Sequence, residues 1–189
     1  MILGSTSPRR ASLLSQLGLS FRVLAPEVDE TYFAGEKPVA YVTRMSNEKH
    51  AAVSNSLDSG SLVISADTVV LIDDDILGKP ESAEDGFSML CRLSGTQHRV
   101  LTSVTIGLNG GKNEQFVIET IVRFRTLTTI ECAAYWRTGE PQDKAGGYGI
   151  QGVGAIFIES IQGSYTNVVG LPLTETAQVL RGFEISILD

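Results

Sequence analysis

The first 25 residues carry the pattern that most restricts the fold of this chain. A short apolar start, Met1 to Leu3, predicts a strand, and a helix then begins where Ser7 can cap its N-terminus and Pro8 takes its first position. Phe21 to Ala25 predicts a second strand. A strand, a helix and a strand in so short a stretch predict a βαβ unit with a parallel strand pair, and hence an α/β fold.

The first turn of that helix contains Arg9 and Arg10, at the end where the helix dipole disfavours cations. Together with Ser5 and Ser7 they would suit a bound anion, since hydroxyls, backbone amides and arginine forks all bind phosphate oxygens. The alternative is an ordinary helix start whose arginines point into solvent. The stretch is not a Walker A motif, because G-x-x-x-x-G-K-[ST] does not occur in the chain.

Length and charge limit the function classes. A chain of 189 residues suits one domain or two closely packed lobes, and we expect a single domain over residues 1–189. The net charge of −7 argues against a protein that coats nucleic acid, but a local basic pocket for a small anion remains compatible. Cys91 and Cys132 fall in predicted helices, and we expect two buried free thiols. No signal peptide or membrane-length apolar run is visible, so we expect a cytoplasmic protein without nucleic-acid or membrane partners.

Two charged residues fall in segments predicted to be buried. Asp67 stands in the middle of the apolar run Leu62–Ile72, where a carboxylate must be paired, hydrogen-bonded or bound to a metal. The alternative is a strand end or bulge at which Asp67 faces water. Lys49 lies on the apolar stripe of a helix predicted from Pro38 to about Asn55. It either extends to the surface along that stripe or reaches a phosphate, and the sequence leaves both open.

Two acidic segments allow different interpretations. The loop at residues 27–30 holds ordinary solvated charges at Glu27, Asp29 and Glu30 or, if phosphate binds nearby, a carboxylate that carries Mg²⁺. Asp73–Asp75 resembles a metal cluster in composition, but a solvated hairpin turn is the simpler interpretation. A hairpin centred there would bring Lys79 close to Asp67 across the strand pair.

The segment Asp143–Gly152 is too rich in glycine for a regular element, and its glycines would permit close approach to a ligand. Among its polar groups are Lys144 and Gln151, and the amide of Gln151 offers both a donor and an acceptor for a base edge. Val153 to Ile161 then predicts a strand.

Ten short motifs occur along the chain in a fixed order: Ser5-Thr6-Ser7-Pro8-Arg9-Arg10, Asp29-Glu30, Lys49, Ala66-Asp67-Thr68, Gly78-Lys79-Pro80, Leu93-Ser94-Gly95, Asp143-Lys144-Ala145-Gly146, Tyr148-Gly149-Ile150-Gln151-Gly152, Gly163-Ser164-Tyr165 and Val169-Gly170-Leu171-Pro172. The series covers nearly the whole chain and resembles the Maf family of nucleoside triphosphate pyrophosphatases, also known as septum formation inhibitors. The resemblance implies an inosine-triphosphatase-like (Maf/Ham1-like) α/β fold. This fold has a mixed, extended and curved sheet flanked by helices, with two lobes and a central cleft.

The resemblance also implies the reaction, the cofactor and the assembly. The family hydrolyses a nucleoside triphosphate to the monophosphate and pyrophosphate with a divalent cation, Mg²⁺ or alternatively Mn²⁺, and its members are usually homodimers. One branch acts on dTTP and UTP, with some modified pyrimidine triphosphates, and a sister branch acts on 7-methyl-GTP. Arg9-Arg10, Thr68 and Gln151 match the first branch. Gly4 departs from the pattern, since Ala is commoner there, and we expect this small change to matter little.

Carried over residue by residue, the resemblance assigns three groups of site residues. The expected catalytic residues are Asp67, Lys79 and Lys49. The expected substrate-binding residues are Ser5, Ser7, Arg9, Arg10, Thr68, Lys144 and Gln151. The expected metal ligands are Glu30 and Asp67, and whether Asp67 is the general base or a metal ligand stays open. The alternatives to a dTTP/UTP pyrophosphatase are a 7-methyl-GTP pyrophosphatase and a non-catalytic nucleotide-binding regulator of cell division.

Overall fold

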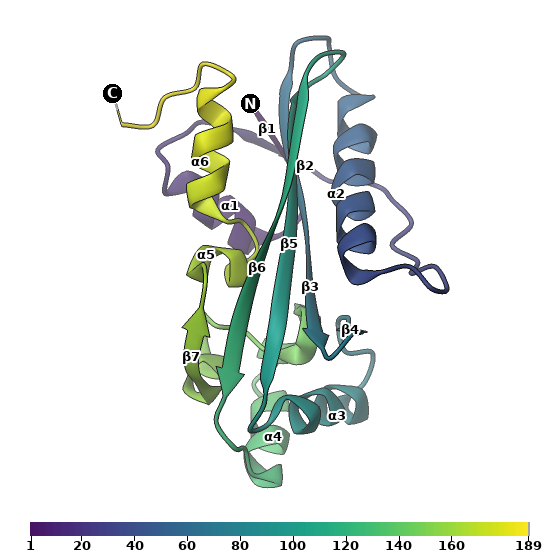
Figure 1. Ribbon diagram of the computed structural model, residues 1–189, viewed down its shortest axis with the longest axis vertical. Helices are drawn as coiled ribbons and strands as arrows, with labels where there is room; N and C mark the ends of the chain where they lie inside the picture. Colours follow the sequence, from purple (N-terminus) through teal and green to yellow (C-terminus); the bar gives the residue numbers. More distant parts are fainter. Residues whose placement is uncertain (189) are drawn as a thin grey trace. The chain divides into compact units, whose positions relative to one another are not determined.

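The computed structural model describes residues 1–188 and contains a seven-stranded mixed sheet with flanking helices (Figure 1). The order along the sheet is β2-β1-β3-β5-β6-β7, and β4 pairs with β3 beside this path. The strands are β1 (Ile2–Gly4), β2 (Arg22–Leu24), β3 (Leu62–Ile72), β4 (Asp75–Leu77), β5 (Gln97–Leu108), β6 (Asn113–Phe124) and β7 (Ile158–Gln162). The helices are α1 (Pro8–Ser15), α2 (Pro38–Ser54), α3 (Ala83–Leu93), α4 (Thr129–Trp136), α5 (Tyr165–Val169) and α6 (Leu173–Arg181). Three short 3-10 helices are η1 (Glu140–Asp143), η2 (Ala145–Gly147) and η3 (Val153–Phe157).

The chain divides into two compact units. Unit 1 holds residues 1–67, 102–118 and 170–188, and unit 2 holds residues 68–101 and 119–169. The strands β3, β5 and β6 therefore contribute residues to both units. The single domain predicted over residues 1–189 stays a prediction.

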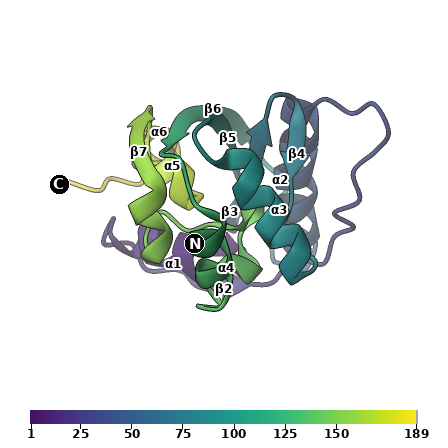
Figure 2. The same ribbon diagram turned by 90° about the horizontal axis from the view of Figure 1, so that it is seen from below.

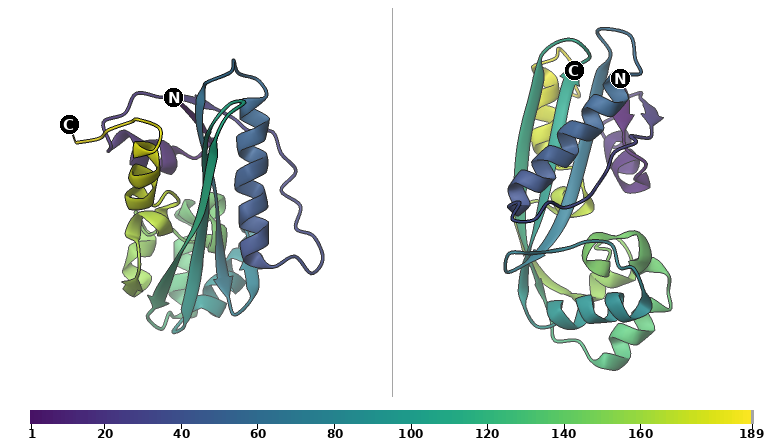
Figure 3. Two further views of the ribbon diagram at one scale, coloured as in Figure 1. Left: turned by 45° about the horizontal axis from the view of Figure 1, so that its top comes forward. Right: turned by 90° about the vertical axis from the view of Figure 1, so that its right-hand side faces the viewer.

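Unit 1 contains the predicted βαβ unit. β1 pairs in parallel with β2, where Ile2 lies opposite Arg22, and in parallel with β3, where Ile2 lies opposite Val63. Helix α2 covers one face of the unit 1 strands, and α1 and α6 lie on the other face (Figures 1 and 3). Leu13 and Leu14 of α1 are buried, as the apolar pattern of that helix predicts. The N-terminal loop is thus held against a fixed core.

Unit 2 is built on an aromatic core. The rings of Phe124, Tyr148 and Phe157 pack with Tyr135, and His98 makes edge contacts with Phe124 and Tyr148 at centroid distances of 5.0 and 5.3 Å. Helices α3 and α4 pack against each other in this unit (Figure 2). β4 pairs antiparallel with β3 through the predicted acidic turn, and β7 pairs antiparallel with β6. The mixed α/β sheet expected from the sequence is confirmed.

Two expectations from the sequence were wrong. The segment predicted as a strand from Val153 to Ile161 begins as the 3-10 helix η3, and strand β7 starts only at Ile158. Cys132 is buried as predicted, but Cys91 is exposed. The helical period explains this exposure, because it turns Leu90 and Leu93 of α3 into the core and Cys91 outward. No helix within residues 1–188 is long and apolar enough to cross a membrane.

Candidate functional site

The loop between β1 and α1 is organised by its hydroxyl groups. Ser7 caps α1, because its side chain accepts from the backbone amide of Arg10 at 3.4 Å. Ser5 accepts from the backbone amide of Ser7 at 3.2 Å and from Nη1 of Arg10 at 3.3 Å. Nε of Arg10 donates to the carbonyl oxygen of Gly170 at 2.8 Å. The predicted anion-binding loop therefore exists as a folded turn, and its second arginine is tethered from two sides.

A buried lysine lies between two carboxylates in unit 1. Nζ of Lys49 is 2.6 Å from Oε1 of Glu30 and 2.7 Å from Oδ1 of Asp67. Lys49 comes from α2, Asp67 from β3, and Glu30 from the loop between β2 and α2. The interpretation that Lys49 extends to the surface was wrong, because its side chain is buried and its ammonium contacts the two carboxylates. Contact with a phosphate stays a prediction. Asp67 is buried and paired, as a carboxylate in an apolar strand must be.

Two further groups belong to this charged cluster. Burial lowers the pKa of Arg10 from its ordinary value, and Arg9 adds to that effect, whereas Asp67 and Glu30 oppose it. The pKa of Tyr41 is raised to about 12 by burial and by the charges of Asp67 and Glu30. The hydroxyl of Tyr41 donates to the backbone carbonyl of Glu30 at 3.0 Å. Tyr41 was not among the predicted site residues, although its helical spacing from Lys49 on α2 was a usable signal.

The cluster suits a divalent cation bound with a phosphate ligand. The carboxylates of Glu30 and Asp67 both contact the ammonium of Lys49, so the two side chains lie close enough together to share one cation. Mg²⁺ prefers such oxygen ligands and commonly takes one or two carboxylates, completed by substrate phosphates and water. Within residues 1–188, no group of three or more His, Cys, Asp or Glu side chains is arranged to hold a metal. Glu30 and Asp67 are the two carboxylates of this cluster that could hold such a cation.

Four of the predicted site residues belong to unit 2. Thr68 is half-buried on β3, and Lys79 is exposed after β4. The ammonium of Lys144 lies 2.7 Å from the carbonyl oxygen of Glu140 and 2.6 Å from Oδ1 of Asp143. Gln151 is exposed in the glycine-rich segment. Their roles at the site stay predictions.

The glycine-rich segment closes around a carboxylate that the sequence analysis missed. Glu140 accepts from the hydroxyl of Tyr135 at 2.7 Å and from the amide of Gly154 at 3.1 Å. A Cβ atom on Gly152 would lie 2.3 Å from Oε2 of Glu140, so only glycine fits there without displacement. The close approach of a ligand to these glycines stays a prediction, and the group that lies against Gly152 in the structure is Glu140 of the same unit. The amide of Val153 also donates to Glu140, at 2.7 Å, which explains why no strand starts there.

The carboxylate of Glu140 is held in its charged form. Burial raises its pKa, but the hydrogen bonds from Tyr135, Gly154 and Val153 lower the pKa by more, and the net shift is below the ordinary value. A charged Glu140 fixes the backbone just after Gln151, because it accepts from the amides of Val153 and Gly154.

Comparisons with known proteins agree with the motif series. A family model described as "Maf-like protein" matches residues 1–183. A protein of Pseudoalteromonas atlantica named dTTP/UTP pyrophosphatase is 49% identical over 189 residues, which is 98% of each chain. A protein of Vibrio cholerae with the same name is 46% identical over 183 residues, which is 97% of each chain. Among solved structures, a nucleoside-triphosphatase / dITP/XTP pyrophosphatase from Mycobacterium abscessus matches over 97% of this chain and 94% of that chain. Its TM-score is 0.46 and its sequence identity 12%.

Proposed function

The chain belongs to the Maf family, and we propose that it hydrolyses dTTP and UTP to the nucleoside monophosphate and pyrophosphate. The observation that carries the proposal is the buried cluster in which Lys49 lies between Glu30 and Asp67, with the guanidinium of Arg10 in the field of both carboxylates. Relatives with nearly full coverage carry the name of this activity, which supports the choice of substrate. Modified pyrimidine triphosphates belong to the same proposal.

In this proposal the N-terminal loop holds the triphosphate. Ser5 and Ser7 face the phosphates, and Arg9 and Arg10 supply positive charge at the N-terminus of α1. The tether from Arg10 to the Gly170 carbonyl keeps one guanidinium in place before substrate arrives, which reduces the ordering that binding requires.

Asp67 is the proposed acceptor of the proton from the attacking water. Its position in a buried strand keeps the carboxylate fixed, and the contact with Lys49 keeps it oriented. Lys49 and Lys79 stabilise the negative charge that develops on the departing pyrophosphate. Glu30 and Asp67 would hold Mg²⁺ or Mn²⁺, and the cation supplies charge neutralisation at the phosphate oxygens.

The proposal is tested with purified protein, Mg²⁺ and a panel of nucleoside triphosphates, with products separated by ion exchange. We expect monophosphate and pyrophosphate from dTTP and UTP, and an Asp67→Asn variant that folds but loses turnover. Products from 7-methyl-GTP alone would support the sister-branch activity instead. Tight binding of triphosphates without turnover would support a nucleotide-binding regulator of cell division.

Base selection is assigned to a second set of residues. Thr68 and Gln151 would contact the base, Arg9 would help to set the substrate pose, and Lys144 would contribute to substrate binding. A pyrimidine 4-carbonyl with its N3–H presents an acceptor and a donor, which the amide of Gln151 can match. We expect Gln151→Glu to lower the rate with dTTP relative to 7-methyl-GTP, and an unchanged ratio would refute the assignment. A homodimer in the cytoplasm, without nucleic-acid or membrane partners, completes the proposal.

A further inference from the structure

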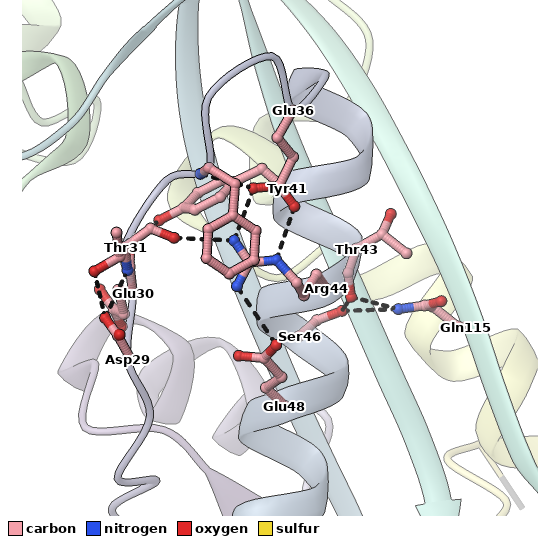
Figure 4. A network of polar contacts seen from close by, with 11 residues as sticks. Asp29, Glu30, Thr31, Glu36, Tyr41, Thr43, Arg44, Ser46, Glu48 and Gln115 are labelled. Atoms are coloured by element: carbon pink, nitrogen blue, oxygen red, sulfur yellow. Dashed lines mark hydrogen bonds and ion pairs between the residues drawn. The ribbon is translucent and has the colours of Figure 1, made fainter.

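The loop that carries Glu30 is fastened to helix α2 by the side chain of Arg44 (Figure 4). Nε and Nη2 of Arg44 each donate to one carboxylate oxygen of Glu36, both at 2.7 Å. Nη2 also donates to the backbone carbonyl of Thr31 at 3.0 Å. This is a bidentate, charge-assisted contact with a third bond to the residue next to Glu30, and such contacts fix geometry as well as adding energy.

We propose that Arg44 is a positioning residue that holds the loop at residues 29–37 so that Glu30 presents its carboxylate to Lys49 and to the divalent cation. The inference rests on the proposed function, because it assigns Glu30 the part of a metal ligand. Arg44 itself contacts neither substrate nor cation in this proposal.

Aromatic contacts strengthen the fastening. The guanidinium of Arg44 lies 4.1 Å from the ring centroid of Phe33 and 5.5 Å from that of Tyr41. The Tyr41 ring makes an edge contact with Tyr32 at 5.5 Å, and its hydroxyl bonds the Glu30 carbonyl. Arginine stacks on such rings with its planar guanidinium, which a lysine side chain cannot reproduce. The loop is therefore held at Glu30 itself and at the residues that follow it.

Helix α2 provides a fixed base for this contact. Nε2 of Gln115, on β6, donates to the Thr43 carbonyl at 2.9 Å and to Oγ of Ser46 at 3.0 Å. Ser46 in turn bonds Ser103 of β5 at 2.7 Å. These bonds set the rotation of α2 against the strands, so the same helix places Lys49 toward the carboxylates and Arg44 toward the loop. The cap residue of α2, Lys37, makes no side-chain cap bond, and the Arg44–Glu36 contact joins the preceding segment to this helix.

For Arg44→Gln, the loss of positive charge and the loss of loop positioning predict opposite changes in metal affinity. Arg44 is a cation near a proposed cation site, so loss of its charge alone would strengthen metal binding. Loss of the Arg44 contacts to Glu36 and Thr31 would weaken metal binding, because Glu30 would no longer be held in position. For Glu36→Gln, both explanations predict weaker binding. For Arg44→Lys, which keeps the charge but loses the fork, only the positioning explanation predicts weaker binding.

The experiment measures Mn²⁺ binding by electron paramagnetic resonance, with and without the non-hydrolysable α,β-imido analogue of dUTP. We expect Arg44→Gln, Arg44→Lys and Glu36→Gln to weaken Mn²⁺ binding about tenfold, which is typical for loss of an outer-shell partner. Amide hydrogen exchange over residues 29–37 should become faster in all three variants.

Arg125→Gln is the matched control. Arg125 also makes a bidentate contact, to Glu131 at 2.6 and 3.2 Å, donates to the Ile156 carbonyl and stacks on Phe157, all within unit 2. The Arg125→Gln variant should leave the Mn²⁺ affinity and the amide hydrogen exchange over residues 29–37 unchanged. Equal or tighter Mn²⁺ binding in Arg44→Gln would overturn the inference, as would an equal loss in Arg125→Gln. Absence of pyrophosphate release by the unmodified protein would refute the proposed function, and the Mn²⁺ and exchange measurements would still decide the role of Arg44.

Discussion

Replacement of Lys49 by methionine tests the charged cluster without relying on turnover. The substitution keeps an apolar stem of similar length and removes the ammonium that lies 2.6 and 2.7 Å from Glu30 and Asp67. Loss of one partner from a buried ion pair costs about 3–5 kcal/mol, because the other charge stays buried. The side chain of Glu30 is half exposed and Arg10 still attracts Asp67, so we expect a loss at the lower end, about 3 kcal/mol of unfolding free energy.

Added Mg²⁺ should reverse part of this loss. In Lys49→Met the two carboxylates lack their shared ammonium, so a cation that binds only the folded protein would stabilise the variant more than the unmodified protein. A metal at a hundredfold excess over its dissociation constant contributes about 2.7 kcal/mol. Urea unfolding with and without Mg²⁺ measures both effects, and Lys49→Met/Asp67→Asn is the control in which the recovery should disappear. A Lys49→Met variant as stable as the unmodified protein, or one that gains no more from Mg²⁺, would refute this account of the cluster.

Two predictions concern groups outside the cluster. Burial lowers the pKa of His98 from 6.5 to about 4, so the unfolded chain binds the additional proton first, and stability falls as the pH drops from 6.5 to about 4. We expect urea unfolding to show a loss of about 3 kcal/mol of unfolding free energy over that interval. His98→Gln should flatten this part of the pH profile of stability, and an equal slope in the variant would contradict the assignment. A Cβ on Gly4 would lie 2.4 Å from Oγ of Ser65, so Gly4→Ala should destabilise the protein by about 1–3 kcal/mol. Ser65→Ala should relieve the strain, and purely additive effects in the double-mutant cycle would exclude this contact.

The Gly4 position also shows where a sequence comparison falls short. From the sequence, glycine in place of the commoner alanine is expected to matter little. In the structure the space for a methyl group is taken by the Ser65 hydroxyl, from a strand that pairs with β1. The two residues are distant in the chain, and nothing in either local pattern couples them. Whether such a substitution changes stability depends on a contacting residue that only the fold identifies.

Local patterns predicted the elements that depend on neighbouring residues. The Ser7 cap, the Pro8 start and the parallel pair of the first two strands are confirmed. They were predictable because each depends on residues that lie close together in the chain. The acidic turn before β4 is likewise a local feature. The strand predicted from Val153 was wrong because the amides of Val153 and Gly154 bond the carboxylate of Glu140, which no periodicity reveals.

The charged cluster was partly predictable for a different reason. Burying a charge is unfavourable enough that each of Asp67 and Lys49, found alone in an apolar pattern, required an explanation. The sequence therefore indicated a buried charge at Asp67 and left Lys49 open, and their pairing with each other follows from the same physics once α2 lies against β3. The choice of Glu30 as the third member depended on the family resemblance, because the residues of its loop show no periodicity of their own.

Arg44 had no comparable signal, and the reason lies in its surroundings. On the helix it follows the spacing of an ordinary surface pair with Glu48, and that contact is long, at 3.4 Å. Its short bonds go to Glu36 and Thr31, which precede the helix in an irregular segment. The Arg44–Glu36 pair is bidentate and largely shielded, with side-chain exposures of 20% and 11%, so it can add to stability. Stability gives no reason, however, for the further bond from the same guanidinium to the Thr31 carbonyl, next to Glu30. A role in placing Glu30 gives that reason, and it makes Mn²⁺ affinity the quantity that distinguishes positioning from a contribution to stability in an Arg44 substitution.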